Sequence, residues 1–263
     1  MTDDIAFEKI PVTEINNSSN NNNKYLGKCS SDLNIFLQGK FNKVLEIDPD
    51  LSKTIDHLKK SSSKAVIFGG WVRDRAIEFQ KKGDFHSQDI DIVVTDIDQR
   101  GLEESLFKPA TPNIFGGFSI STKNNKIDIW RLENTFSIKR FNLAKDIHVL
   151  PETTVFRINS IVFKPEQFWH ESETFEHGCT SAIENNKIDF QSHMIPFPEI
   201  QAARALIYAA KLKFNLSQEV VKFIDNICVC KNDVHRIENG LREKCPSKFL
   251  MDAIELLRSI IEK

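Results

Sequence analysis

The sequence predicts an α+β fold, in which a small mixed β-sheet with flanking helices is followed by an all-helical C-terminal half. Short apolar runs of strand length, bounded by Gly, Asn and Asp, occupy the central third of the chain. Helical spacing of apolar residues occurs before and between these runs. From about Pro198 onward the apolar residues keep helical spacing alone. A length of 263 residues suits one large domain or two small ones.

The composition excludes several classes of protein. The 35 basic and 37 acidic residues give a net charge of -2, which excludes a histone-like polycation and an acidic solvating tail but leaves room for a local basic surface. No apolar stretch approaches the roughly 20 residues of a membrane-spanning helix. The five cysteines are an odd number in a chain too large to need disulfides. We therefore expect a cytoplasmic protein with reduced thiols and no membrane partner.

The N-terminal part begins with a polar tract and continues with two helices. Residues 16–23 read NNSSNNNN, a low-complexity sequence that cannot bury a core, and they predict a flexible Asn-rich arm over residues 1–30. A first helix is predicted by the helical spacing of Leu33, Phe36, Leu37, Phe41 and Val44. Asp50 or Ser52 is expected to cap a second helix that runs to about Lys60.

The rest of the chain divides into a mixed part and a helical part. Strands are predicted at residues 65–68, 89–94, 115–121, 126–132 and 155–163. A helix is predicted at residues 71–79, a hairpin turn at Asn124-Asn125, and a further helix at residues 99–106 with Asp98 as its cap. In the C-terminal half, helices are predicted at residues 202–212, 218–227, 233–243 and 248–261, with Pro246 separating the last two.

Gly69 and Gly70 stand between a predicted strand and a predicted helix. Two glycines at such a turn let backbone N–H groups approach a ligand, and the start of a helix favours an anion such as a phosphate. Taken alone, the pair is more typical of a simple tight turn. It becomes informative together with the acidic residues further along the chain.

Acidic residues alternate with apolar ones in two of the predicted strands. Asp89 and Asp91 are two residues apart, so both carboxylates project from the same face of their strand. Paired carboxylates repel each other unless a cation lies between them, and Mg²⁺ prefers such oxygen ligands. Asp128 has similar apolar neighbours and would join the pair if the two strands are adjacent. Three such carboxylates can hold two metal ions for nucleotidyl transfer. The alternative is that they are solvated strand residues.

A resemblance to a known family rests on two motifs, Gly69-Gly70-Trp71-Val72-Arg73-Asp74 and Asp89-Ile90-Asp91. Together they resemble the head domain of class II CCA-adding enzymes and bacterial poly(A) polymerases, within the polymerase-β nucleotidyltransferase superfamily. The resemblance implies a polymerase-β-like nucleotidyltransferase head followed by a helical neck. It implies catalytic metal ligands at Asp89 and Asp91, and nucleotide-binding residues at Gly69, Gly70, Arg73 and Asp74. Asp128 matches the third catalytic metal ligand in position and character only.

The resemblance continues downstream. Residues 156–161 read Phe-Arg-Ile-Asn-Ser-Ile and resemble the family segment Phe-Thr-Ile-Asn-Ala-Leu, which adds Asn159 to the implied nucleotide-binding residues. Residues 204–214 resemble the first helix of the neck. The implied organisation is the flexible arm at 1–30, a nucleotidyltransferase head at 31–165, and a connecting segment with a helical neck-like domain at 166–263.

Two family segments are replaced in this chain. The Arg-Arg-Asp that precedes the Phe-Thr-Ile-Asn segment is here Thr153-Thr154-Val155. The Glu-Asp-x-x-Arg that selects C and A falls at Phe197-Pro198-Glu199-Ile200-Gln201. The catalytic carboxylates are thus kept while the residues that would read a base edge are not, and little chain follows the neck to grip tRNA. We expect a divergent short member of the family.

The expected activity is metal-dependent nucleotidyl transfer of the EC 2.7.7 type, with Mg²⁺, or alternatively Mn²⁺, as cofactor. An NMP would pass from an NTP such as ATP to an acceptor hydroxyl with release of pyrophosphate, and an RNA 3′ end is the expected acceptor. A protein or a small molecule is an alternative acceptor, as in a toxin or defence system. A non-catalytic nucleotide- or RNA-binding module is a second alternative. The sequence does not indicate the oligomeric state.

Overall fold

The structure is a computed structural model, and it describes residues 10–15, 27–61, 63–83, 87, 89–106, 110–113 and 116–262. The Asn-rich tract at 16–23, and with it most of the predicted arm over 1–30, lies outside the described residues. The described chain divides into two compact units. A sheet unit comprises residues 27–154 and 159–179, and a helical unit comprises residues 10–15, 155–158 and 180–262.

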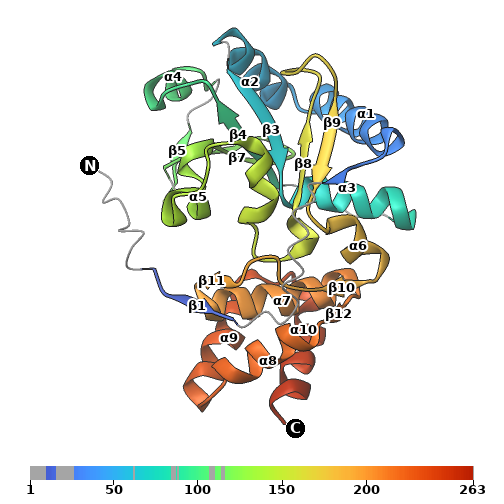
Figure 1. Cartoon of the computed structure of the whole chain (residues 1–263), viewed down its shortest axis with the longest axis vertical. Helices are drawn as coiled ribbons and strands as arrows, with labels where there is room; N and C mark the ends of the chain where they lie inside the picture. The colour runs from blue at the N-terminus through green and yellow to red at the C-terminus, as the bar shows by residue number, and fades with distance from the viewer. Residues whose placement is uncertain are drawn as a thin grey trace. The chain divides into compact units, whose positions relative to one another are not determined.

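The described part of the sheet unit contains an eight-stranded mixed β-sheet (Figure 1). Its strands lie in the order β2 (Gly27–Lys28), β9 (Glu173–Glu176), β8 (Ile161–Lys164), β3 (Lys64–Phe68), β4 (Asp89–Thr95), β7 (Lys126–Arg131), β6 (Phe118–Ser121) and β5 (Thr111–Pro112). Among these described strands β4 and β7 are parallel neighbours, and the other pairs are antiparallel. The predicted α+β class with a mixed sheet is confirmed.

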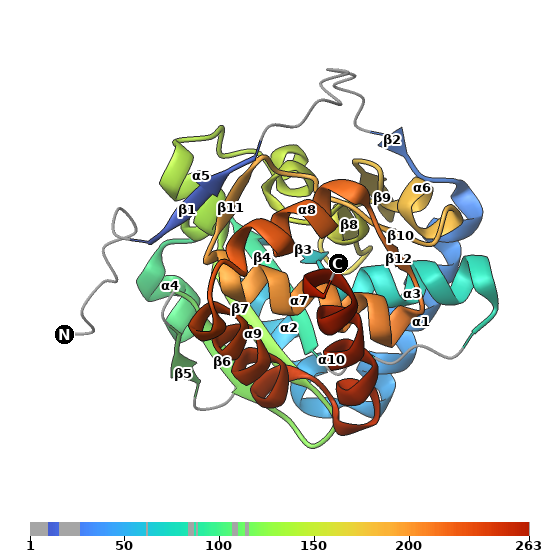
Figure 2. The same ribbon diagram turned by 90° about the horizontal axis from the view of Figure 1, so that it is seen from below.

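Helices and turns cover both faces of the sheet (Figure 2). On one face, α1 (Ser31–Ile47) and α3 (Gly70–Lys81) bring Phe41 and Trp71 together with ring centroids 5.9 Å apart, and Phe41 also meets Phe163 of β8 at 6.3 Å. Strand residues that point the other way form a second core with η2 (Leu132–Asn134), α5 (Phe136–Phe141) and η3 (Ile147–Thr153). Two more helices, α2 (Pro49–Lys60) and α4 (Gln99–Glu104), belong to this unit.

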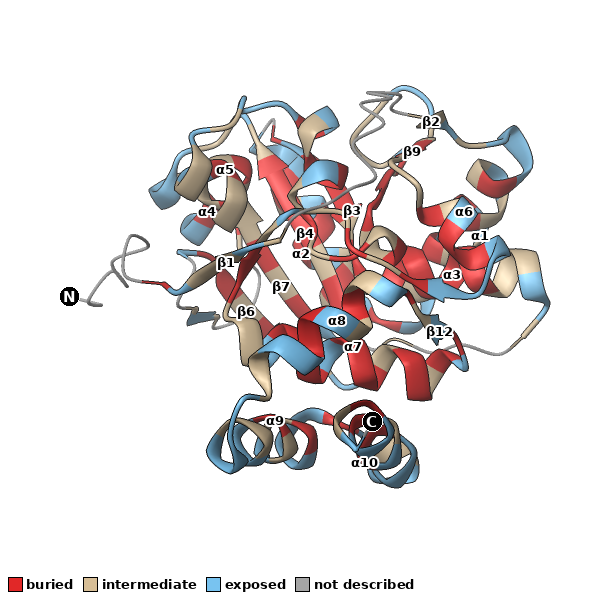
Figure 3. Cartoon of the chain, turned by 60° about the horizontal axis from the view of Figure 1, so that its bottom comes forward, coloured by how far each residue is buried: buried red, intermediate tan, exposed pale blue. Residues whose placement is uncertain are grey.

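The helical unit is built around α7 (Pro198–Leu212), against which α8 (Gln218–Ile227), α9 (Lys231–Lys244) and α10 (Ser247–Ile261) pack. Short sheets pair β1 (Val12–Glu14) with β11 (Met194–Pro196) and β10 (Lys187–Ile188) with β12 (Asn215–Leu216). The Ala-rich α7 is buried along most of its length (Figure 3). A Cβ added at Gly240 of α9 would lie 3.4 Å from Cβ of Ala203, so small residues allow these two helices to approach closely. The predicted helical C-terminal half is confirmed.

No helix in the described chain combines the length and the apolar content needed to cross a membrane.

The predicted cap of α2 is wrong. The N-cap is Asp48 rather than Asp50 or Ser52, because Pro49 takes the first helical position, where its missing N–H costs nothing. The predicted cap of α4 is confirmed: the Asp98 carboxylate accepts the N–H of Gly101.

The strand predicted at 155–163 is also wrong over most of its length. Residues Arg157–Asn159 form a 3-10 turn, η4, and the strand begins only at Ile161. The N–H of Arg157 donates to the carbonyl of Asp189 at 3.0 Å, so this backbone finds its partner outside the large sheet. The strand predicted at 115–121 begins at Phe118, and Phe115 lies outside the described residues.

The buried carboxylate of Asp48 ties the first two helices to the hairpin that carries β7. Its Oδ1 accepts the N–H of Leu51 at 3.1 Å, which caps α2. Its Oδ2 accepts hydrogen bonds from the hydroxyl of Thr122 and, at 2.7 Å, from the side-chain amide of Asn125. Burial raises the pKa of Asp48, but these hydrogen bonds outweigh it and hold the pKa below its ordinary value. One side chain therefore fixes both a helix start and the turn between β6 and β7.

Replacing Asp48 with Ala removes the cap and leaves the hairpin donors without their acceptor. We expect Asp48→Ala to lower the free energy of unfolding by about 2–4 kcal/mol, measured by urea denaturation. Asp50→Ala is the matched control, because it removes the same charge from the first turn of α2 without removing the cap. Equal losses in the two variants would contradict the anchoring role.

Two lysines hold Glu173 at one side of the sheet. Glu173 of β9 pairs in register with Lys164 of β8 and accepts a hydrogen bond from its ammonium group. Lys28 Nζ lies 2.8 Å from the other carboxylate oxygen. The hydrogen bonds from Lys164 and Lys28 lower the pKa of Glu173 to about 2, although partial burial opposes them.

This depressed pKa predicts a pH-dependent contribution to stability. The folded pKa of Glu173 lies below the ordinary value of 4.5, so its ion pairs stabilise the fold above about pH 4.5 and lose that contribution as the pH falls toward 2. We expect Glu173→Gln to cost about 1 kcal/mol at pH 7 and less at pH 3. Denaturant unfolding at both pH values measures the difference, with the exposed Glu171→Gln as the control. A loss that is the same at both pH values would refute the linkage.

Candidate functional site

Four charged residues form a square array on one face of the sheet. In the parallel pair of β4 and β7, Asp91 is the register partner of Asp128, and Asp89 is the register partner of Lys126. Side chains two apart on a strand share a face, and register partners share it too. The alternate positions of both strands are isoleucines that are completely buried, at Ile90, Ile92, Ile127 and Ile129. The charged residues therefore point to the opposite face of the sheet, which Val93 of β4 shares as part of the second core.

Asp128 is oriented by two donors. Ser119 of β6 is its register partner on the other side, and the Ser119 hydroxyl donates to Oδ1. Lys126 Nζ donates to Oδ2 at 2.9 Å. Both carboxylate oxygens thus have a partner, and the side chain of Asp128 is 22% exposed.

The charges of all three aspartates act on the ammonium group of Lys126. The hydrogen bond with Asp128 raises the pKa of Lys126; partial burial opposes it, and the negative charges of Asp128, Asp89 and Asp91 raise it further. The three carboxylates therefore produce a negative potential at one place.

Carboxylate oxygens of this kind suit a divalent metal ion. As the side chains lie, the described residues include no group of three or more His, Cys, Asp or Glu that could hold a metal ion. The carboxylate oxygens of the array fit a divalent metal by their chemistry. In the structure, the ammonium group of Lys126 lies against one of them.

The glycine turn lies directly against this array. Gly69 follows β3 and precedes α3 with φ 73° and ψ -130°, a conformation open to glycine and strained for other residues. A Cβ at Gly69 would lie 3.0 Å from Oδ2 of Asp91, so the absence of a side chain also makes room for that carboxylate. The first turn of α3 contains no acidic residue, which leaves its N-terminus favourable for an anion.

Arg73 and Asp74, in the helix that follows this turn, form a buried ion pair. Arg73 is 4% exposed and Asp74 is fully buried. Nε and Nη2 of Arg73 lie 2.7 and 2.6 Å from Oδ1 of Asp74, and Nη1 donates to Oδ1 of Asn159 at 2.7 Å. A Cβ at Gly70 would lie 3.7 Å from Nη2 of Arg73. These contacts connect the first turn of α3 to Asn159, far along the chain.

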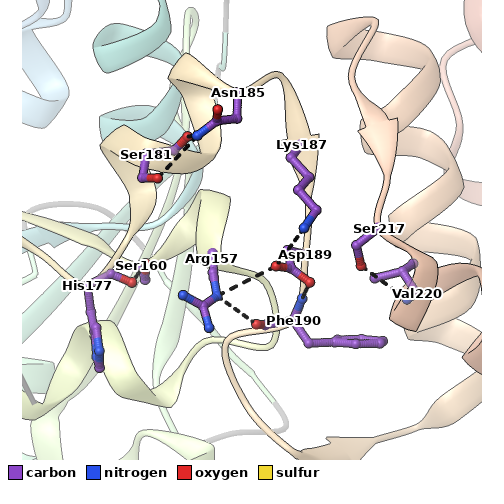
Figure 4. Close-up of polar contacts among 10 residues, drawn as sticks. All are labelled: Arg157, Ser160, His177, Ser181, Asn185, Lys187, Asp189, Phe190, Ser217 and Val220. Carbon is purple, nitrogen blue, oxygen red and sulfur yellow. Dashed lines mark hydrogen bonds and ion pairs between the residues drawn. The ribbon is translucent and has the colours of Figure 1, made fainter. Parts of the chain in front are cut away.

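The chain on either side of Asn159 is held by further hydrogen bonds (Figure 4). In the sheet unit, the hydroxyl of Ser160 donates to the carbonyl of His177 at 2.8 Å, and the N–H of His177 donates to the carbonyl of Ser160 at 2.9 Å. In the helical unit, Nε of Arg157 donates to the carbonyl of Phe190 at 3.1 Å. Within the sheet unit, the hydrogen bond from Arg73 and the bonds of the neighbouring Ser160 hold Asn159 in place.

The structure brings the eight residues selected from the sequence into one unit. Asp89, Asp91 and Asp128 share a face of the sheet, Gly69 lies against Asp91, and Arg73 links Gly70 with Asp74 and Asn159, as described above. Sequence reasoning missed Lys126 and Ser119. Lys126 stands two residues before Asp128 and is on its face by strand alternation, whereas Ser119 is found only from the hairpin register.

The two glycines of the turn are expected to differ in their tolerance of a side chain. Gly69→Ala should lower the free energy of unfolding by about 1–3 kcal/mol, because the backbone conformation becomes strained. Gly70→Ala should change it by less than about 1 kcal/mol, since the added Cβ meets only ordinary contacts at 3.7 Å. Urea denaturation of both variants checks this, and equal effects would contradict the assigned backbone role of Gly69.

Comparison with known proteins identifies the fold. No protein-family model and no curated protein matches the chain. A solved CCA-adding enzyme in complex with ATP superposes with a TM-score of 0.59 at 16% identity, covering 88% of this chain and 54% of that one. A tRNA-processing enzyme with CTP superposes with a TM-score of 0.53 at 17% identity, covering 79% of this chain and 56% of that one. The Thermotoga maritima CCA-adding enzyme complexed with tRNA superposes with a TM-score of 0.55 at 16% identity, covering 88% of this chain and 53% of that one. The chain spans about half the length of these proteins, with 53–56% of each covered. It has the fold of CCA-adding enzymes, as its motifs predicted.

Proposed function

We propose that this chain is a metal-dependent nucleotidyltransferase that moves an NMP from an NTP to an acceptor hydroxyl and releases pyrophosphate. The observation that carries the proposal is the placement of three aspartates on one sheet face beside a glycine turn at the start of a helix. Carboxylates for a metal and a helix N-terminus for a triphosphate are the two requirements of this chemistry. The likeness in fold to CCA-adding enzymes supports it.

In this proposal Asp89, Asp91 and Asp128 hold Mg²⁺ or Mn²⁺. The chemistry that the metal supplies when bound is neutralisation of phosphate charge and activation of the attacking hydroxyl. The protein's own contribution is to hold three oxygen donors on adjacent strands. The buried isoleucines between them keep the strands in register, so the backbone positions of the three donors are fixed before a metal binds.

The triphosphate is assigned to the glycine turn. The N–H groups of Gly69 and Gly70 and the acid-free first turn of α3 suit phosphate oxygens. Arg73, Asp74 and Asn159 complete the nucleotide-binding residues, and the ion pair between Arg73 and Asp74 holds the turn in place from below. Nη2 of Arg73 lies near Gly70, and the ion pair with Asp74 keeps it there.

An RNA 3′ end is the acceptor we propose. Support comes from the matched structures, which include a CCA-adding enzyme with ATP, a tRNA-processing enzyme with CTP and a CCA-adding enzyme with tRNA. The competing acceptors are a protein side chain and a small molecule, and the competing class is a non-catalytic nucleotide- or RNA-binding module. These alternatives differ in where a labelled nucleotide ends up.

The decisive variant removes the first two carboxylates. Asp89→Asn/Asp91→Asn should lower incorporation of α-labelled NTP into RNA by at least about 1000-fold, because metal ligands are lost while side-chain volume is kept. Each of the four NTPs is incubated with total RNA and with protein, in Mg²⁺ and in Mn²⁺. Asp96→Asn is the matched control, since Asp96 is an exposed acid just beyond the opposite end of β4, and Asn accepts its φ of 61°.

Label in RNA that only the double variant loses supports the proposal. Label in protein would replace RNA by a side-chain acceptor. Binding of NTP without incorporation into any acceptor would contradict nucleotidyl transfer and favour the binding module.

A further inference from the structure

Lys126 is the charged member of the array that the proposed function does not use. It faces Asp89 across the strand pair and stands two residues before Asp128 on its own strand. Its ammonium group lies 2.9 Å from Oδ2 of Asp128. A positive charge is thus already present where the proposed function needs a metal ion.

The hydrogen bonds of Asp128 leave little room for a second cation. Oδ1 is held by the Ser119 hydroxyl, which approaches from β6. Oδ2 is the oxygen that Lys126 contacts. A divalent ion bound at Oδ2 would therefore lie beside the ammonium group, and the two positive charges would repel each other.

The ion pair is weak enough to be displaced. The side chain of Lys126 is 53% exposed, so the ammonium can move into solvent on its flexible stem. Ion pairs this exposed contribute little to stability. In the metal-free protein, the same ammonium reduces the repulsion among the three carboxylates.

We propose that Lys126 is a tethered counter-cation that competes with a divalent metal ion for Oδ2 of Asp128. Metal binding and the Lys126–Asp128 ion pair are then mutually exclusive, and Lys126 weakens the affinity for metal. This inference rests on the proposed function, because it takes the three aspartates as the metal site. Lys126 acts through Asp128 and is a positioning residue.

The test measures binding of Mn²⁺ to the full chain by the loss of its free EPR signal. Lys126→Met removes the charge and keeps the length of the side chain, and it should tighten Mn²⁺ binding by about tenfold. Lys123→Met is the matched control, because Lys123 is exposed and lies in the turn of the same hairpin, so the net charge changes equally. Lys126→Arg retains the charge and should bind Mn²⁺ like the wild type.

The same substitution made in an Asp128→Asn variant separates competition at Asp128 from a general effect of the lost positive charge. In Asp128→Asn, where the contested oxygen has lost its charge, Lys126→Met should change Mn²⁺ affinity by less than about threefold. The competition is refuted if Lys126→Met leaves the affinity unchanged or weakens it, if Lys123→Met tightens binding equally, or if neither wild type nor variant binds Mn²⁺.

The binding readout is independent of nucleotidyl transfer. Unchanged Mn²⁺ affinity in a variant that still incorporates label overturns the competition and leaves the proposed function standing. Tightened Mn²⁺ affinity in a protein that incorporates no label supports the competition and overturns the function.

Discussion

The parallel register between β4 and β7 is the constraint on which the polar end of the sheet depends. It sets Asp91 opposite Asp128 and Asp89 opposite Lys126. A slip of one residue would turn Asp128 toward the apolar side, where its neighbours are fully buried, and would cost several kcal/mol for an unpaired buried charge. The same slip would expose isoleucines to water. The packing that stabilises the sheet therefore also fixes the distances among the charges, and the site needs no separate scaffold.

The buried pair of Arg73 and Asp74 acts in a similar way on the glycine turn. Both side chains are removed from water, so loss of either partner would leave an uncompensated charge inside the protein. The pair is tied to Asn159 by a hydrogen bond across a sequence separation of 86 residues. The turn between β3 and α3 is thus held by contacts from within its own helix and from a distant segment, which favours a preformed arrangement of backbone donors.

The fold and most of the proposed site could be predicted from the sequence, because both leave local patterns in it. The spacing of Asp89 and Asp91 predicts that they share a face of a strand, and the glycine pair predicts a turn between a strand and a helix. Asp128 could be placed beside them only on the assumption that two strands are neighbours, which β4 and β7 prove to be. Contacts that depend on how distant segments pack had no such signal. These are the hydrogen bond from the Ser119 hydroxyl to Asp128 and the hydrogen bonds from the hairpin to Asp48.

The strand prediction at 155–163 failed because apolar alternation also occurs in the helical unit, where Phe156 stacks on Phe190. The catalytic and nucleotide-binding roles of the selected residues stay predictions.

The path of the chain between its two units restricts how the protein can be divided or recombined. The chain enters the helical unit at Val155, returns to the sheet unit at Asn159 and leaves it again after Cys179. Phe156, which stacks on Phe190 with ring centroids 5.4 Å apart, is therefore supplied to the helical unit from within the sequence of the other unit. A gene fragment cut after residue 179 would separate that ring from its partner. Neither unit can be exchanged by a single crossover, because each is built from separated stretches of the chain.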